Sequence, residues 1–269
     1  TNFTSFNSSE SFKQATKIFI LYSLLTVFIF ISLNIFSIRT FDSLNLALTI
    51  ISSGGFLPVN DLSNIIKDNY QLIVLSLSML FSFFSLFFIY NLFLSKKNIN
   101  FFYEDLHLVI YLIAVVSIFF LFFSFNNDFL YNFLAISSSI SNIGFSLNVQ
   151  QGDLEIVYLI LVIIGGSFFS TSSGLRFIKI YSLFKFSLNQ ILSFSKPKNV
   201  FMNKLIFTKI NFNLNEINKY FLSIIIFILS LFTLASLLSL SGIDFVKSFK
   251  LSILTLMNTV NSSIYGLNE

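Results

Sequence analysis

The sequence predicts an all-α polytopic membrane protein built from repeated units, each with a membrane span, a short pore helix and a second span. Hydrophobic residues make up 55% of the 269 residues and charged residues only 10%, with a mean hydropathy of +0.84. A water-soluble domain of this length needs far more charge to cover its surface. Long apolar runs also alternate with shorter apolar runs that end in small polar residues.

Five long apolar segments are predicted to cross the membrane, because about 18 or more apolar residues in a helix span its hydrocarbon core. Three shorter runs cannot cross it, and each has an aspartate near its start that suits a helix N-cap or first turn. The predicted spans are 16–37, 71–94, 107–125, 154–188 with an interruption, and 219–240; the short runs are 41–52, 128–140 and 244–259, with Asp42, Asp128 and Asp244.

The order of long span, short helix, polar turn and long span recurs roughly every 90 to 110 residues, which predicts internal repeats. Residues 1–100 form one unit with its turn at 52–56, and residues 101–194 form a second with its turn at 141–145. Residues 195–216 are predicted to be a linker. Residues 217–269 form an incomplete unit with a span, a short helix and a turn at 259–266.

The charges predict which way the chain faces. Most of the 16 basic residues lie on the side of the connections 95–106 and 189–218, and most of the 12 acidic residues lie on the side of the turns. By the positive-inside rule the connections are cytoplasmic and the turns face outward. Cations that arrive at the turns would be attracted by the acidic residues.

The polar turns predict a cation filter. Non-helical backbone persists at membrane depth only where protein buries it or where it lines a water-filled cavity. Converging turns can replace the hydration shell of a cation with their carbonyl oxygens, assisted by the negative C-terminal ends of the short helices. Glycine permits the backbone angles that this needs, as at Gly55 and Gly144. The predicted filter residues are Ser52, Ser53, Gly54 and Gly55; Ser141, Asn142, Ile143 and Gly144; and Thr259, Val260, Asn261 and Ser262.

The stretch "GGSFFSTSSG" at 165–174 interrupts a span after only nine apolar residues, which rise about 13 Å as a helix. Small residues let an irregular segment pack across a narrow pore, and hydroxyl groups satisfy the backbone groups that the broken helix releases. We therefore predict a movable intramembrane loop, with a plain helix crossing built on small residues as the alternative. Its flexible ends would be Gly165, Gly166 and Gly174, and its polar lining Ser167, Ser170, Thr171, Ser172 and Ser173.

Two basic residues, Arg176 and Lys179, follow this loop, and their spacing of three places them on one helix face. They are predicted to repel cations or to hold the closed loop through its carbonyl oxygens. The alternative is that both side chains extend to the cytoplasmic interface.

Three segments, "ALTIISSGGF", "ISSSISNIGFS" and "IGGSFFSTSSGLRFIK", resemble the ion-translocating (TrkH-like) subunit of Trk/Ktr-type potassium uptake systems. The resemblance implies four units around a pseudo-fourfold pore, of which this chain carries the second, the third and part of the fourth. The first repeat and the last span would be absent. It also implies that the loop 165–174 gates the pore below the filter.

The same resemblance implies K⁺ as the transported substrate, the bacterial inner membrane as the location, a homodimer, and a cytoplasmic nucleotide-binding (TrkA-like) regulatory subunit. The last turn departs from the family, because Asn261 stands where a glycine is expected. Selectivity for K⁺ alone or for K⁺ together with Na⁺ therefore stays open.

Other functions find less support in the sequence. With no cysteine and one histidine, disulfides, thiolate metal sites and histidine-based catalysis are not expected. The carboxylates are scattered, so we expect no enzyme, no cofactor and no resident metal, and no motif suggests a nucleic-acid partner. The alternative is a secondary transporter whose broken helices form a substrate site at mid-membrane. That alternative predicts interrupted spans in symmetry-related units, and the sequence indicates one interruption.

Overall fold

The computed structural model describes residues 8–59, 61–86, 103–123, 129–147, 154–195 and 214–267, and these residues form helices and no strand. The predicted all-α fold is therefore confirmed. The helices are α1 (Ser8–Ile35), α2 (Thr40–Ser52), α3 (Asn69–Phe83), α5 (Tyr103–Phe123), α6 (Phe129–Ile140), α7 (Glu155–Ile164), α8 (Phe177–Ser195), α9 (Leu214–Leu240) and α10 (Phe245–Leu256), with the short 3₁₀ helices η1 (Leu62–Asn64) and η2 (Ser263–Tyr265).

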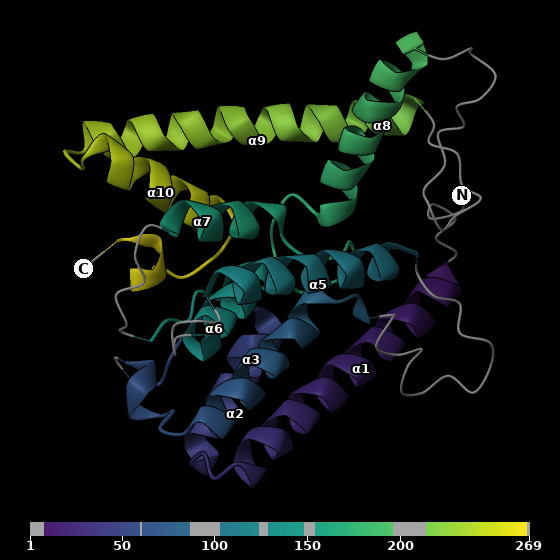
Figure 1. Ribbon diagram of the computed structural model, residues 1–269. Coiled ribbons are helices and arrows are strands. Elements are labelled where there is room, and N and C mark those ends of the chain that lie inside the picture. The colour runs from purple at the N-terminus through teal and green to yellow at the C-terminus, as the bar shows by residue number, and fades with distance from the viewer. Residues whose placement is uncertain are drawn as a thin grey trace.

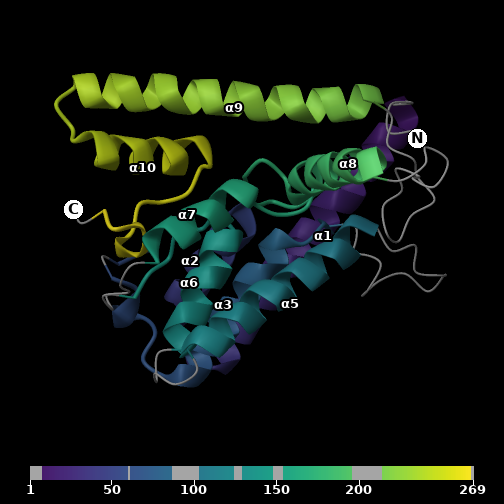
Figure 2. The ribbon, with the colours of Figure 1, turned by 45° about the horizontal axis from the view of Figure 1, so that its top comes forward.

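The helices follow the predicted order of a long helix, a short helix and a second long segment. Helices α1, α2 and α3 form one such set, α5, α6 and α7 with α8 form another, and α9 with α10 begins a third. Helix α3 packs against α6, and α7 packs against α10, so the middle set joins the other two. Both ribbon views show α9 and α10 on one side of α7, with α1 to α3 on the other (Figures 1 and 2).

Helix α1 shows why an apolar segment of this kind folds against its neighbours on one face only. Leu21, Leu25, Ile29 and Leu33 recur every fourth residue and are buried, in the same core cluster as Leu46 of α2. A four-residue spacing places side chains on one face of a helix. The other face of α1 is also apolar and is exposed, as expected of a helix in contact with lipid.

Two described helices are long and apolar enough to cross a membrane by length and composition. They contain the segments Ala15–Ile35 and Asn215–Leu240, with mean hydropathies of 2.4 and 2.7. The other apolar helices are shorter, including Asn69–Phe83 and Glu155–Ile164.

The predicted continuous span at 71–94 is wrong in one respect, because α3 ends at Phe83. Phe84 has extended backbone angles (φ −79°, ψ 158°). The Ser82 hydroxyl bonds back to the Met79 carbonyl at 2.7 Å. The carbonyl oxygens at the end of α3 find their partners in the loop 165–174 rather than in a further turn of helix. Residues 87–102 lie outside the described residues.

The three short helices begin near the expected aspartates. Asp42 lies in the first turn of α2, and Asp244 is the N-cap residue of α10 but makes no capping bond through its side chain. Asp128 lies outside the described residues. Helix α10 ends at Leu256, three residues earlier than the predicted run.

Candidate functional site

The three short helices end in the same way. Just after each helix, one residue adopts left-handed backbone angles. These residues are Ser53 (φ 50°), Asn142 (φ 58°) and Asn258 (φ 50°). The next residue donates its backbone N–H to the carbonyl five positions back, as in a Schellman C-cap. These donor–acceptor pairs are Gly54 to Thr49 at 2.9 Å, Ile143 to Ser138 at 3.0 Å and Thr259 to Leu254 at 2.9 Å. We call residues 53–56, 142–145 and 258–261 the first, second and third turns.

These hydrogen bonds define the register of the turns. The residue that follows the donor is Gly55 in the first turn, Gly144 in the second and Val260 in the third. By the register of these cap bonds, Val260, one residue before Asn261, follows the donor in the third turn. The predicted set Thr259 to Ser262 begins two residues after Met257, which the same register aligns with Ser52 and Ser141.

The turns converge at these three positions. A Cβ atom placed on Gly55 would lie 2.0 Å from the Ile143 carbonyl oxygen and 2.6 Å from Cγ2 of Val260. A Cβ atom on Gly144 would lie 2.3 Å from the Val260 carbonyl oxygen. Both glycines also have positive φ angles, 69° and 88°. Glycine is therefore required at Gly55 and Gly144 both by backbone conformation and by the close approach of a neighbouring turn.

Asn142 links the second turn to two other elements. Its side-chain nitrogen Nδ2 donates to the Val162 carbonyl in α7 at 2.9 Å and lies 3.3 Å from the Thr259 hydroxyl of the third turn. Asn142 is fully buried. Because α7 ends two residues after Val162, this contact also supplies a partner to a carbonyl that the interrupted helix leaves free.

The other predicted filter residues differ in exposure. Ser53, Ser141, Ile143 and Thr259 are buried, whereas Ser52 and Asn261 are exposed. In the first turn the backbone N–H of Phe56 donates to the Thr49 hydroxyl at 2.9 Å, which closes the turn onto α2. Sequence reasoning missed Thr49, although a hydroxyl side chain near a helix C-terminus was a usable signal.

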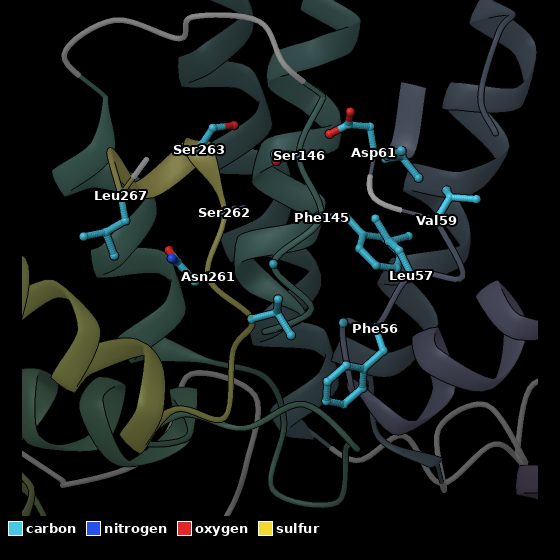
Figure 3. Close-up of a pocket in the computed structure, with 14 residues that line it drawn as sticks. Phe56, Leu57, Val59, Asp61, Phe145, Ser146, Asn261, Ser262, Ser263 and Leu267 are labelled. Carbon is cyan, nitrogen blue, oxygen red and sulfur yellow. The ribbon is translucent and has the colours of Figure 1, made fainter. Parts of the chain in front are cut away.

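A cavity of about 600 Å³ lies beside the turns. Its lining combines Gly55, Gly144 and Val260 with residues that follow each turn, including Asp61. Figure 3 shows Phe56 and Asn261 on opposite sides of this cavity, with Leu57, Val59 and Phe145 gathered together. The polar side chains that line the cavity are Ser146, Ser262, Ser263, Asn261 and the carboxylate Asp61.

Polar contacts join α10 and η2, which lie on either side of the third turn in the chain, to the middle set of helices. Lys250 of α10 forms an ion pair with Glu155 at the start of α7. The Tyr265 hydroxyl lies 3.4 Å from that of Ser139 in α6.

The two ends of the loop 165–174 lie against each other. Gly165 and Gly174 are in contact, since a Cβ atom on Gly174 would lie 2.6 Å from the Gly165 Cα. The Leu175 N–H donates to the Ile163 carbonyl at 2.9 Å, and the Phe177 N–H donates to the Gly166 carbonyl at 3.2 Å. The loop is therefore a compact excursion between α7 and α8.

The body of the loop is bonded to the end of α3. The backbone N–H groups of Ser167 and Ser172 donate to the carbonyls of Phe83 and Ser82, each at 3.1 Å. The Leu86 N–H donates to the Phe169 carbonyl at 3.2 Å. Two interrupted helices thus satisfy each other's free backbone groups. Neither glycine nor proline marks the break in α3, so the sequence carried no strong signal for it.

Of the predicted loop residues, Gly165, Gly166, Ser167 and Ser172 are buried, and Ser170, Thr171, Ser173 and Gly174 are half-buried. The Ser170 and Ser172 hydroxyls lie 2.9 Å apart. The Thr171 hydroxyl lies 3.4 Å from the Ser82 carbonyl. The hydroxyls of Ser170 and Ser172 therefore bond within the loop, whereas that of Thr171 faces the end of α3.

Arg176 and Lys179 have different partners. Nη1 of Arg176 donates to the Ser172 carbonyl at 2.7 Å and to the Ser167 carbonyl at 2.9 Å, both in the loop. Its backbone has φ 76°, a conformation that costs a non-glycine residue about 1 kcal/mol. Lys179 instead donates from Nζ to the Ser223 hydroxyl of α9 at 3.3 Å. Arg176 therefore holds the loop, and Lys179 joins α8 to α9.

Among the described residues there is no group of three or more His, Cys, Asp or Glu side chains placed to hold a metal ion. The chemistry of the site comes from peptide oxygens, hydroxyls and the C-terminal ends of α2, α6 and α10. These helix ends carry partial negative charge that favours a nearby cation.

No protein-family model matches this chain, and no curated protein matches it. Among solved structures, a crystal structure of the potassium transporter TrkH from Vibrio parahaemolyticus is similar to it, with a TM-score of 0.78 and 17% sequence identity. The similarity covers 91% of this chain and 55% of the transporter chain, so this chain spans about half of that length. At this identity the likeness shows a shared fold.

Proposed function

We propose that this chain forms part of a membrane-embedded pathway for K⁺, or for K⁺ together with Na⁺, in which the three turns line a filter and the loop 165–174 is a gate. The observation that carries the proposal is the convergence of the turns. Gly55 lies against the Ile143 carbonyl, and Gly144 lies against the backbone of Val260. Three helix C-termini thus present peptide oxygens around one place, which is the arrangement that replaces the hydration shell of a cation.

The contacts of the loop support the gating role. Val162 in α7 accepts a hydrogen bond from Asn142 of the second turn. Helix α7 ends two residues later, at Ile164, where the loop begins. A few backbone hydrogen bonds to Ser82 and Phe83, together with Arg176, hold it closed. Breaking a small number of such bonds is a modest cost, so the loop can open without unfolding the helices around it.

The wider setting of the proposed pathway follows from the resemblance and the shared fold. We place residues 1–100 and 101–194 as two complete units, 195–216 as a cytoplasmic linker, and 217–269 as part of a further unit. The turns would face outward across a bacterial inner membrane. A homodimer and a nucleotide-binding (TrkA-like) regulatory subunit on the cytoplasmic side would complete the assembly.

One observation favours the alternative of a broken-helix secondary transporter. Helix α3 and helix α7 are both interrupted, and each is the second long helix of its set. However, the polar groups at the two interruptions bond to each other, as in the contact of Ser172 with Ser82. In a transporter of this kind the freed groups instead bind the substrate.

The function is tested by potassium-limited growth of an uptake-deficient bacterium that expresses the full-length gene. Wild type should restore growth, and Gly144→Ser should fail, because its side chain would overlap the Val260 carbonyl. Gly242→Ala is the matched control, since a Cβ atom there meets nothing within 4 Å. Equal growth of wild type and Gly144→Ser would contradict the filter, and no growth of wild type above the empty vector would contradict the function.

Rubidium uptake separates the gate from the alternative. Deletion of Phe168 and Phe169 shortens the loop and removes its bond to Leu86. A gate predicts faster uptake in this variant, whereas a substrate site in the loop predicts that uptake is lost.

A further inference from the structure

The third turn differs from the other two at the position where they meet. The first and second turns have glycine there, and the third has Val260. The backbone of Val260 packs on Gly144, and its side chain packs on Gly55, with Cγ2 and Cβ 2.6 Å and 2.9 Å from where a Cβ of Gly55 would lie. Val260 therefore contacts both of the other turns and is the only side chain carried at these three equivalent positions.

This position is also open to the cavity. Val260 lines it together with Gly55 and Gly144, so the isopropyl group stands where the cavity reaches the turns. In the proposed pathway, an ion that leaves the cavity between the turns would pass this group.

An isopropyl group cannot take the place of water around a cation. Peptide oxygens compensate a cation for the water it loses, but an alkyl group offers it no ligand, and apolar constrictions obstruct ions by excluding their hydration water. The glycines at the equivalent positions avoid this obstruction because they have no side chain.

We propose that Val260 is an apolar barrier within the filter, and that this side chain limits the rate at which cations pass the turns. The inference rests on the proposed function and adds to it a second restriction, separate from the loop 165–174. The loop is held by α3 and Arg176, whereas the barrier is formed by Val260 against Gly55.

The test measures initial rates of rubidium uptake in the uptake-deficient bacterium, using full-length protein and rates normalised to the amount of protein in the membrane. Val260→Ala and Val260→Gly should raise the rate, with Val260→Gly reaching on the order of tenfold, as expected when an alkyl group is removed from a constriction. Val260→Ile should lower it. Val246→Ala is the control, because Val246 is an exposed valine of α10, the helix that precedes the third turn.

The outcomes separate the barrier from the function on which it rests. If Gly144→Ser abolishes uptake but Val260→Ala and Val260→Gly leave the rate unchanged, the filter stands and the barrier is refuted. If Val260→Gly does not reach the membrane, Val260→Ala and Val260→Ile decide the question by opposite changes in rate. If wild type carries no rubidium and Val260→Gly does, the barrier is supported. If neither wild type nor any Val260 variant exceeds the empty vector, both the function and the barrier are refuted.

Discussion

Replacing Gly55 by alanine tests directly whether the first and second turns are packed as the structure places them. The new Cβ atom would lie 2.0 Å from the Ile143 carbonyl oxygen, which belongs to the backbone of the second turn. That distance is roughly 1 Å or more inside van der Waals contact, so one of the two turns must move.

The cost has two parts. The φ angle of 69° at Gly55 costs an alanine about 1 kcal/mol. The overlap with a backbone oxygen adds about 3 kcal/mol, at the upper end of the range for overpacked sites. For a chain of this size, the sum of about 4 kcal/mol corresponds to a fall of roughly 8 to 16 °C in melting temperature.

The assay is thermal unfolding of the purified full-length protein in detergent, combined with rubidium uptake in cells. Gly242→Ala separates the two parts of the cost, because Gly242 also has a positive φ (95°) but open space around it. It should lower the melting temperature by only about 2 to 4 °C and leave uptake unchanged.

Equal destabilisation by Gly55→Ala and Gly242→Ala would refute the reasoning, since it would leave only the backbone angle as a cost. Normal uptake by Gly55→Ala would likewise mean that the first and second turns are not in contact during permeation.

The remaining predictions concern the loop, the link between the turns and α7, and the orientation of the chain. Arg176→Gln removes two charge-assisted bonds worth about 1.5 kcal/mol each, so rubidium uptake should rise on the order of a hundredfold; an unchanged rate would mean that the arginine does not hold the loop closed. Asn142→Ala leaves a buried carbonyl of α7 without its donor and should lower the free energy of unfolding by about 1 to 3 kcal/mol. The control Asn45→Ala, whose bond stays within α2, should lower it by about 0.5 kcal/mol or less. Similar losses in the two variants would argue against the link between the second turn and α7. A membrane-impermeant thiol reagent applied outside the cell should label Ser146→Cys, which lines the cavity, and should spare Ser187→Cys, which is exposed on α8; the reverse pattern would invert the proposed orientation.

Local features of the sequence were sufficient to predict the short helices and most of the turns. The runs 41–52 and 128–140 are too short to cross a membrane and end in polar residues, and they became α2 and α6 within a residue of the predicted bounds. Gly55 and Gly144 were recognisable because a positive φ angle and a close approach both select glycine.

The third turn was harder to place because its position in the repeat carries no glycine. The resemblance aligned Asn261 with the glycines, whereas the bond from the Thr259 N–H to the Leu254 carbonyl makes Val260 the residue that follows the cap donor. A backbone hydrogen bond defines the register of a helix cap, and the side chains alone do not specify it.

Length, hydropathy and the spacing of polar turns by themselves predicted a helical membrane chain with repeated units, because these properties depend on residues close together in the chain. Only the tertiary structure decided that α3 breaks at Phe83, that the loop 165–174 closes on this break, and that Val260 stands between the other turns. The reason is that the partners come from distant segments: the carbonyls of α3 meet N–H groups that lie more than 80 residues further along the chain. Such contacts form only once the helices have packed.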